Sequence, residues 1–310
     1  MKRTLAGAYL SVILAMIFWG FTFVLFKYAS ESFRPVTIVF LRLFVSIFFL
    51  FGFAWMFKRL GRIKRKDQKW FLLMALFEPF FYFLGEANGL MLVSPTVGAV
   101  IISTIPLIVP FGAYYLFREK LTRLNIIGLV ISFAGVLMVV LNRSSGTVTD
   151  SRGILLLFVA VVAAVGYTLV ARKLVEDYNP ITITAYQSFY GLLMFLPLFV
   201  FRELPLPDLD SISTSSLLSV LYLGVFGSGI CFILLTLAIR ELGAAKANIF
   251  ANIVPVVTAV VSFLMLREPM PLIKVSGILV AIAGLLMTQV GTINWKMPAK
   301  KGGFRHPPYS

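Results

Sequence analysis

The amino-acid sequence predicts an all-α polytopic membrane protein with ten transmembrane helices, built from two inverted five-helix repeats. Composition is the first reason. The 310-residue chain is 59% hydrophobic and 13% charged, with a mean hydropathy of +0.94, and a soluble surface needs far more charge. The second reason is that its apolar runs are close to the roughly 20 residues that span a bilayer. The third is a pattern of Pro, Arg-Glu and Gly that occurs twice, 149 residues apart.

Ten apolar runs alternate with short charged segments. They are too long and too uniformly apolar for the strands of a membrane barrel, so each is predicted to be a helix. The Lys2-Arg3 start resembles a signal peptide, but nine further runs follow it, and we expect an uncleaved first helix. The predicted spans are 8–29, 36–57, 70–91, 95–117, 123–142, 153–172, 180–201, 213–238, 244–266 and 272–291.

The repeated pattern divides the chain into two matching halves. It reads Pro106, Arg118-Glu119, Gly128 and Gly135 in the first half, and Pro255, Arg267-Glu268, Gly277 and Gly284 in the second. We place the first repeat at 8–142, the second at 153–291 and a cytoplasmic basic tail at 292–310. Since five helices is an odd number, the second copy enters the membrane from the opposite side, which is the architecture of alternating-access carriers. The alternative is a duplication that merely enlarged a helix bundle.

The net charge of +15 is concentrated on one side of the predicted membrane. With the N-terminus in the cytoplasm, most of the 28 Lys and Arg residues fall inside, above all those of segment 58–69. This positive-inside excess predicts that both termini are cytoplasmic. We expect the chain to be integral to a bacterial-type inner (plasma) membrane. We expect segment 58–69 to meet anionic lipid head groups, and we expect no nucleic-acid partner.

Cysteine and histidine are too scarce for catalysis or metal binding. Cys231 is the only cysteine and is expected to be a buried small hydrophobe, while the single histidine, His306, lies in the polar tail. The sequence has no HExxH, CxxC, P-loop or Ser-His pair. We therefore expect no enzyme activity, no catalytic residue, no metal, no cofactor and no direct use of ATP.

The two copies of the pattern resemble the EamA domain of the drug/metabolite transporter superfamily. They read IPLIVPFGAYYLFREKLT with GLVISFAG, and VPVVTAVVSFLMLREPMP with GILVAIAG. Trp19-Gly20 is also typical of these proteins, although the second copy has Val165-Gly166 instead. The resemblance covers nearly the whole chain. It implies ten helices, inverted repeats, a central cavity and export of small metabolites, without naming a substrate.

The best candidates for a binding site are polar residues that the repeat does not share. Glu78 lies near the middle of the third span, where a buried charge is costly unless it is paired, protonated or hydrated. Tyr82, Gly85 and Glu86 follow at helical spacing and form one stripe with it. Glu78 is predicted to be a proton site or a site for a substrate amine. The alternative is a carboxyl satisfied by a neighbouring helix.

Arg42 lies at a depth similar to that of Glu86, so the two are expected to form an ion pair. This pair is either a structural clamp or an outer gate. The counterpart of Arg42 in the second repeat is Gln187, and the counterpart of the Glu78 segment is Gly227-Ser228-Gly229. The first copy therefore has charged residues at these positions, and the second copy has neutral residues and flexible glycines.

Other polar and aromatic residues complete the predicted cavity lining. Asn248 and Asn252 are one helical turn apart and are expected on one face, either as contacts between helices or as a hydrogen-bonding site for substrate. Trp19, Tyr167 and Gln187 are the remaining lining candidates.

The repeated residues are expected to frame this site. Pro106 and Pro255 are matched hinge candidates inside helices four and nine, or else static kinks. Pro79, Gly227 and Gly229 are further hinge candidates. The glutamates that follow Arg118 and Arg267 are expected either to cap the next helix or to latch a gate. The paired glycines allow close helix packing; they are Gly128, Gly135, Gly277 and Gly284.

These features predict a secondary active transmembrane transporter that works by alternating access and exports small organic metabolites, amino acids or drugs. The expected partners are a small-molecule substrate and membrane lipids, with protons considered as the coupling ion and either a monomer or a homodimer as the assembly. The alternatives are a membrane-embedded enzyme or assembly factor without transport activity, and an oligomeric channel.

Overall fold

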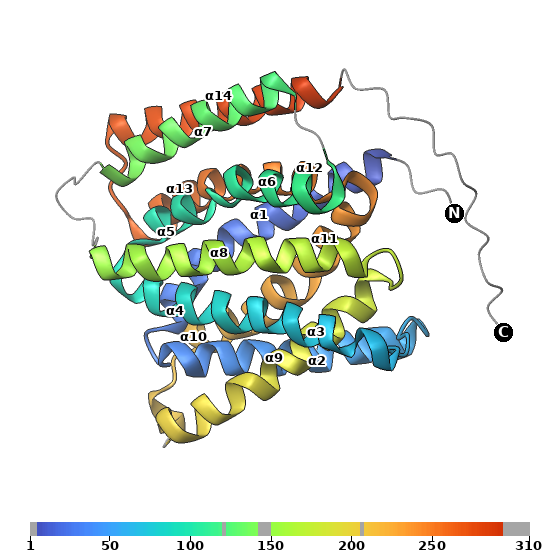
Figure 1. Ribbon diagram of the computed structural model, residues 1–310. Helices are drawn as coiled ribbons and strands as arrows, with labels where there is room; N and C mark the ends of the chain where they lie inside the picture. Colours follow the sequence, from blue (N-terminus) through green and yellow to red (C-terminus); the bar gives the residue numbers. More distant parts are fainter. Residues whose placement is uncertain (1–4, 120–121, 142–149, 205–207, 294–310) are drawn as a thin grey trace.

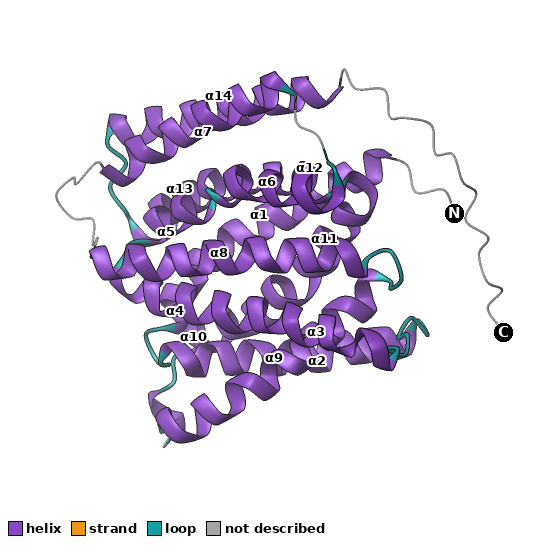
Figure 2. Cartoon of the chain, viewed as in Figure 1, coloured by secondary structure: helices purple, strands orange, loops and turns teal. Residues whose placement is uncertain are grey.

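A computed structural model describes residues 5–119, 122–141, 150–204 and 208–293, in which helices make up the regular structure (Figures 1 and 2). The predicted all-α class is confirmed for these residues. Among them, eight helical segments are long and apolar enough to cross a membrane. They are Leu5–Ala29, Pro35–Met56, Arg65–Leu92, Pro95–Phe117, Ser151–Leu174, Pro180–Arg202, Thr214–Leu242 and Ala244–Leu266.

Four of the eight segments are continuous α-helices, and the other four change helical form in mid-span. The continuous ones are α1 (Leu5–Ala29), α2 (Pro35–Met56), α8 (Ser151–Leu174) and α9 (Pro180–Arg202). Two further apolar helices, α7 (Arg123–Leu141) and α14 (Leu272–Ile293), lie side by side at the top of Figure 1. The basic tail predicted at 292–310 falls almost entirely outside the described residues.

The interrupted segments break at matching places in the two halves. In the first half, α3 (Gln68–Ala75) joins α4 (Tyr82–Leu92) through the π-helical η2 (Leu76–Phe81), and α5 (Pro95–Ile102) leads through Ser103-Thr104 to α6 (Ile105–Phe117). In the second half, α10 (Thr214–Tyr222) joins α11 (Cys231–Leu242) through the π-helical η4 (Leu223–Ile230), and α12 (Ala244–Ile249) leads through η5 (Phe250–Asn252) to α13 (Ile253–Leu266). A shift of 149 residues brings these breaks into register.

The hinge prolines lie at these breaks. Pro106 and Pro255 are each in the first turn of a new helical segment, where a residue without an N–H loses no hydrogen bond. Both prolines therefore lie at breaks inside the predicted fourth and ninth spans, and their role as hinges or static kinks stays a prediction. Pro79 lies inside η2 and follows Glu78, whose backbone is extended at φ −145° and ψ 115°. The second copy makes its π-helical segment without proline, around Gly227 and Gly229.

Each Arg of the Arg-Glu pairs ends a helix in the left-handed conformation. Arg118 has φ 57° and ψ 26° at the end of α6, and Arg267 has φ 53° and ψ 34° at the end of α13. A left-handed residue at this position is a common way to terminate a helix. The turn directs the following glutamate, Glu119 or Glu268, away from its own helix axis.

The repeated glycines form the contact between α7 and α14. A Cβ on Gly128 would lie 2.5 Å from the carbonyl oxygen of Gly284, and a Cβ on Gly135 would lie 2.4 Å from that of Gly277. The packing role predicted for these glycines is confirmed, because no other residue permits so close an approach. The pairing runs in opposite directions along the chain, so the two helices are antiparallel.

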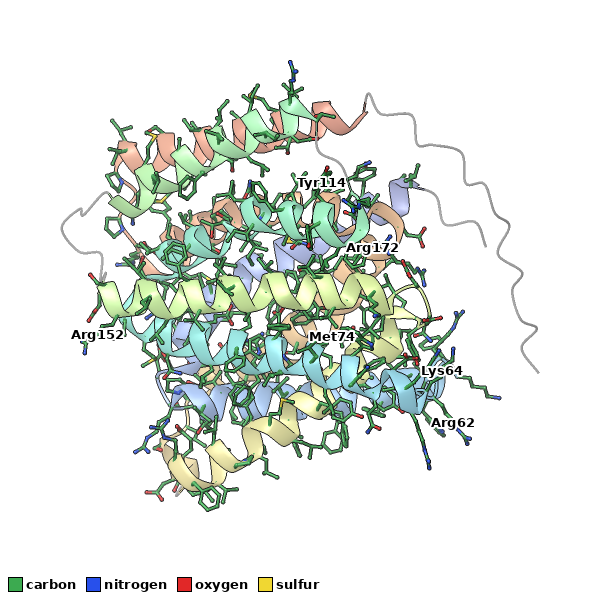
Figure 3. All side chains as sticks on the ribbon, viewed as in Figure 1. Arg62, Lys64, Met74, Tyr114, Arg152 and Arg172 are labelled. Carbon is green, nitrogen blue, oxygen red and sulfur yellow. The ribbon has the colours of Figure 1, made fainter. Side chains whose placement is uncertain are left out.

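Basic side chains gather at one end of the bundle. Figure 3 shows Arg62 and Lys64 in the connection between α2 and α3 at that end, with Arg152 at the opposite end. The connection is held in place by α9 and the turn before it: the N–H of Gly61 donates to Oγ1 of Thr182 at 2.8 Å. The basic side chains are thus presented from a fixed backbone.

Candidate functional site

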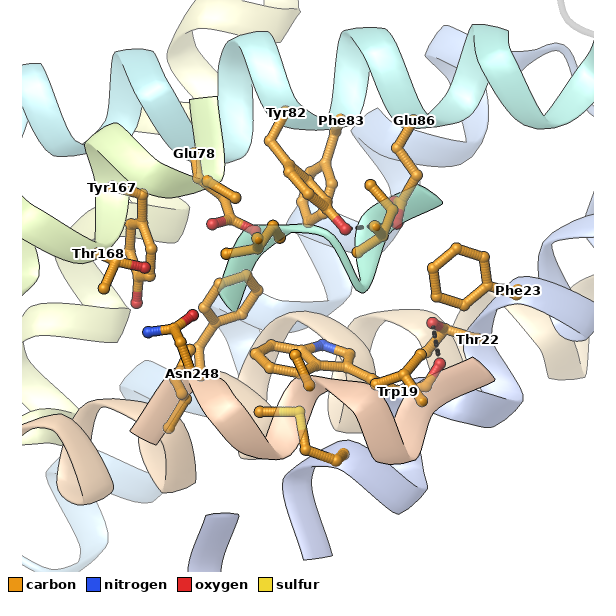
Figure 4. A pocket seen from close by; sticks show the side chains of 18 of the residues that line it. Trp19, Thr22, Phe23, Glu78, Tyr82, Phe83, Glu86, Tyr167, Thr168 and Asn248 are labelled. Carbon is orange, nitrogen blue, oxygen red and sulfur yellow. Dashed lines mark hydrogen bonds between the residues drawn. The ribbon is translucent and has the colours of Figure 1, made fainter. Parts of the chain in front are cut away.

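A central cavity lies between the two halves of the bundle (Figure 4). Its volume is about 60 Å³, where roughly 10–15 Å³ holds one water molecule. The first half lines it from α1, α2, η2, α4, α5 and α6, and the second half from α8, α11, α12, η5 and α13. The helices α7, α9 and α14 do not line it. The cavity therefore depends on both copies and on most of the interrupted segments.

Glu78 is the least satisfied charged group of this cavity. It is 5% exposed, and among the described residues it makes no hydrogen bond or ion pair. Figure 4 shows its carboxyl directed into the cavity between Tyr82 and Tyr167. The extended backbone in η2 turns this side chain inward, so the expected α-helical stripe through Glu78 is interrupted. A buried carboxyl without a partner has to obtain a proton or a cation from the cavity.

Arg42, Glu86 and Tyr82 form a second polar cluster in the cavity. The hydroxyl of Tyr82 donates to Oε1 of Glu86 at 2.9 Å. Nη1 of Arg42 lies 3.5 Å from Oε2 of Glu86, so the expected ion pair is present but long. Nε of Arg42 donates to Oγ of Ser228 at 2.8 Å, and its guanidinium lies 4.1 Å from the centre of the Phe83 ring. Arg42 of the first half is thus bound to η4 of the second.

Aromatic side chains form another wall of the cavity. The Trp19 ring meets that of Phe232 edge to face, with centroids 5.2 Å apart, and the Tyr167 ring meets Phe232 at 5.6 Å. Nε1 of Trp19 donates to the carbonyl oxygen of Gly227 at 3.0 Å, a carbonyl of the π-helical η4. Such rings favour solutes with apolar or cationic parts.

The structure brings together seven of the nine predicted lining residues. The seven are Trp19, Arg42, Glu78, Tyr82, Glu86, Tyr167 and Asn248. Gln187 is buried in α9, away from the cavity. Asn252 is also excluded: its amide donates to Oγ of Ser132 on α7 at 2.6 Å. The expectation that Asn248 and Asn252 share one face was wrong, because the chain changes from α12 to η5 between them.

Several lining residues were missed by the sequence analysis. Thr22 and Thr168 line the cavity from α1 and α8, and each ends a Gly-aromatic-Thr triplet that the two halves share. That repeated triplet was the signal that could have identified them. Gly85, by contrast, packs on α8: a Cβ there would lie 2.5 Å from the carbonyl oxygen of Leu156. It does not widen the cavity.

The two glutamates of the repeated Arg-Glu pairs bind opposite halves of the molecule. Glu119 accepts hydrogen bonds from the N–H groups of Ala244 and Ala245 at 3.2 and 3.0 Å, and from Nε of Arg172 at 3.1 Å. It caps the start of α12, because an N-terminus leaves N–H groups unpaired. We call this set of contacts the Glu119 clasp.

The second glutamate makes the corresponding contact at the other end of the bundle. Glu268 accepts hydrogen bonds from the hydroxyls of Ser94 and Thr96, both at 2.8 Å, and from Nζ of Lys274 at 2.9 Å. Ser94 and Thr96 begin α5, the counterpart of α12. We call this set the Glu268 clasp. Among the described residues, neither glutamate caps the helix that follows it: Glu119 caps α12, and Glu268 binds the start of α5 and pairs with Lys274 of α14. The alternative expectation, that the glutamates latch a gate, stays a prediction.

Metal ligands are not grouped in the part of the chain that the structure describes. No three of its His, Cys, Asp and Glu side chains lie close enough together to hold an ion. Cys231 is buried, as expected for a small hydrophobe, with its thiol 3.4 Å from the carbonyl oxygen of Ala15.

Comparisons with known proteins find the same similarity in both halves. Residues 6–141 and 151–290 each match the EamA-like transporter family. An uncharacterized transporter of Archaeoglobus fulgidus is 28% identical over 272 residues, which cover 88% of this chain and 95% of the relative. The uncharacterized transporter YetK of Bacillus subtilis is 26% identical over 288 residues, 92% of this chain and 87% of the relative.

A solved crystal structure has the same fold. It superposes with a TM-score of 0.74 over 93% of this chain and 98% of the other, at 15% sequence identity. Identity this low is informative about the fold alone. The two family matches cover nearly the whole chain, and they agree with its apolar helices. This integral membrane protein therefore belongs to the EamA-like transporter family.

Proposed function

We propose that the protein is a secondary carrier that moves a small organic solute by alternating access, in the direction of export, and that it is not an enzyme. The observation that carries this proposal is the central cavity, which is lined by both halves and contains a buried carboxyl without a partner. A cavity midway between two copies of one fold can open to either side by the same rearrangement. Its volume of about 60 Å³ favours a small solute, such as an amino acid, over a large drug.

The proposed architecture is ten transmembrane helices in two inverted repeats, at 8–142 and 153–291. Three features support it. The breaks of the interrupted segments overlap after a shift of 149 residues. The equivalent helices α7 and α14 pack antiparallel, as inversion requires. The Glu119 and Glu268 clasps lie at opposite ends of the bundle. In one, the first copy supplies the glutamate and the second supplies the start of a helix; in the other, the copies are reversed.

We place both termini in the cytoplasm of a bacterial-type cell. The support is the basic segment 58–69, which lies at one end of the bundle (Figure 3). Basic segments are retained on the cytoplasmic side during insertion. The Glu119 clasp is then near the cytoplasm and the Glu268 clasp near the outside.

Protons are the proposed coupling ion, and Glu78 is the proposed proton site. Its carboxyl is buried in the cavity and has no hydrogen-bond partner among the described residues. A proton bound to this carboxyl from outside would be released to the cytoplasm before the solute binds, and the solute would then be carried outward in its place. Pro79, Gly227 and Gly229 lie in the π-helical segments beside it, and we propose that these segments, with the breaks at Pro106 and Pro255, are where the helices bend.

The test is a transport screen with purified full-length protein in proteoliposomes. Amino acids, small amines and drugs are offered under an imposed pH gradient. We expect saturable, gradient-dependent movement of at least one small solute, and counterflow when that solute is present on both sides. Counterflow excludes a channel, and unchanged solute on recovery excludes an enzyme. A screen with neither saturable flux nor counterflow would contradict the proposal.

A further inference from the structure

We propose that Gly227 and Ser228 form a socket that positions Arg42 to bind a carboxylate of the solute. This inference rests on the carrier function proposed above and assigns a chemical class to its substrate. Ser228 is a positioning residue here, because it acts on the solute through Arg42.

The socket is built from close contacts between the two halves. Oγ of Ser228 accepts from Nε of Arg42 at 2.8 Å. A Cβ on Gly227 would lie 2.9 Å from Nη2 of Arg42 and 3.0 Å from Cγ2 of Thr22, so Arg42 occupies the space that a side chain at 227 would need. The carbonyl oxygen of Gly227 also accepts from Trp19. One π-helical turn thus fixes two large side chains of the opposite copy.

Most of the hydrogen-bonding capacity of Arg42 is unused. A guanidinium carries five N–H donors, and among the described residues Arg42 makes two hydrogen bonds, one of them 3.5 Å long. Its acidic neighbour Glu86 is already bound by Tyr82 at 2.9 Å. Arg42 is 3% exposed and lines the cavity, so its free donors have water or a solute as their remaining partners.

The chemistry of these free donors identifies the ligand. A planar guanidinium binds a carboxylate through two parallel hydrogen bonds, which a lone hydroxyl or an ammonium cannot reproduce. Ser228 is neutral, so it fixes the orientation of the guanidinium without neutralising its charge. The corresponding turn of the first copy has Glu78-Pro79, an acid in place of a hydroxyl socket. The asymmetry between the copies therefore matches a solute with a carboxylate at the Arg42 end.

The experiment measures binding to purified full-length protein by thermal unfolding. The probes are three solutes of similar size: sodium propionate, L-alanine and propylamine hydrochloride. A ligand that binds only the folded state raises the Tm. We expect propionate and L-alanine to raise the Tm of the wild type, and propylamine to leave it unchanged. Stabilisation by propylamine alone, or by none of the three, would overturn the proposal.

Variants test whether Ser228 acts specifically on ligand binding or only stabilises the fold as any buried hydroxyl does. Ser228→Ala is expected to weaken carboxylate binding roughly tenfold, the equivalent of one hydrogen bond to a charged group. Ser228→Thr keeps the hydroxyl and is expected to restore binding. Ser46→Ala is the matched control, because it removes a buried hydroxyl of α2 that contacts Ser188 and not Arg42. Equal weakening by Ser46→Ala would reject the socket.

Failure of the socket proposal can be distinguished from failure of the carrier proposal. If carboxylates bind with the expected dependence on Ser228 but no solute crosses the membrane, the carrier is rejected and the socket stands. If a solute without a carboxylate is transported and no carboxylate binds, the carrier stands and the socket is rejected.

Discussion

At Glu78, burial, an extended backbone inside a helix and the lack of a hydrogen-bond partner coincide in one residue. The extended backbone is the conformation that Pro79 favours in the residue before it. Burial without a partner lowers stability, and a chain under no functional demand has no reason to keep such a carboxyl. The neighbouring acid Glu86 is different, because Tyr82 and Arg42 both contact it. The two acids, two turns apart in sequence, therefore differ in their partners, and Glu78 is the one that we propose as the proton site.

Replacement of Glu78 by glutamine tests this role. Glu78→Gln is expected to abolish solute movement driven by a pH gradient, while solute counterflow without a gradient persists. The free energy of unfolding is expected to remain within about 1 kcal/mol of the wild type, because a neutral amide of the same shape leaves no charge unpaired. Flux is measured in proteoliposomes and stability by thermal unfolding.

Glu203→Gln provides the control for that experiment. Glu203 accepts a hydrogen bond from Thr37 at 2.9 Å, at the far end of α9 and away from the cavity. Gradient-driven flux through this variant is expected to equal that of the wild type. Normal gradient-driven flux through Glu78→Gln would remove Glu78 from the coupling mechanism.

The charged residues of the site were predictable from the sequence because their chemistry is out of place in a membrane. Glu78, Glu86 and Arg42 were identified because charge is rare there. Ser228 was not assigned a role, since a small hydroxyl in a helix usually bonds its own backbone and its partner lies 186 residues away. Gln187 was assigned wrongly for the related reason that repeat equivalence does not imply equivalent surroundings.

At the scale of elements, the two clasps have the same plan and different energetics. In the Glu268 clasp the ion pair is buried, with Lys274 0% and Glu268 7% exposed. In the Glu119 clasp the partners are 23% and 19% exposed, and Arg172 also pairs with Glu176. A buried cation that loses its partner costs far more than one that can reach water.

This difference predicts unequal effects of the same substitution. Glu268→Gln is expected to lower the free energy of unfolding by about 3 kcal/mol, because Lys274 is left buried without a charge partner. Glu119→Gln is expected to lower it by about 1 kcal/mol, because Arg172 keeps Glu176 and water. Thermal unfolding of the two variants shows which of them loses more of the free energy of unfolding. An equal loss, or a larger loss for Glu119→Gln, would contradict this prediction.

Structural elements were predictable where a short stretch of sequence has residues that are typical of them. Repeated glycines at seven-residue spacing indicated the seam between α7 and α14 because a missing side chain has one physical use there. Pro79 marked a disturbance in the third span. The matching π-helical segment η4 contains no proline, and nothing in its composition distinguishes it from a flexible α-helix.

At the scale of the whole molecule, both clasps are formed at once and the cavity between them is small. In the proposed alternating-access cycle, a solute enters when the halves separate at one end. Because each clasp joins a helix of one copy to a glutamate of the other, separation at an end breaks that end's clasp. Simultaneous opening would leave a continuous pore, which a carrier has to avoid.

Chemical labelling tests this alternation and the orientation together. In a Cys231→Ala background, Ser94→Cys and Ala245→Cys each place one thiol in a clasp. With a membrane-impermeant maleimide, we expect S94C to react only from outside and A245C only from the cytoplasm. Substrate present on one side is expected to raise the labelling rate of one cysteine and lower that of the other. Reaction of both positions from the same side would contradict inversion.

The general architecture was predictable because it depends on sums over many residues, such as hydropathy, charge asymmetry and repeat spacing. The partners of the clasps were not, since Glu119 and Ala244 are 125 residues apart and their contact follows from the packing of complete halves. The same limit applied to the cavity, whose lining was predictable only in part.

The exchange of glutamates between copies has a consequence for synthesis of the chain. The start of α5 is made early, but the carboxylate that binds Ser94 and Thr96 belongs to Glu268, near the end of the second half. The ribosome has therefore completed the first half and most of the second before α5 obtains this partner. The Glu268 clasp therefore cannot form before the second half has been synthesised past α13, so Ser94 and Thr96 lack this partner until then.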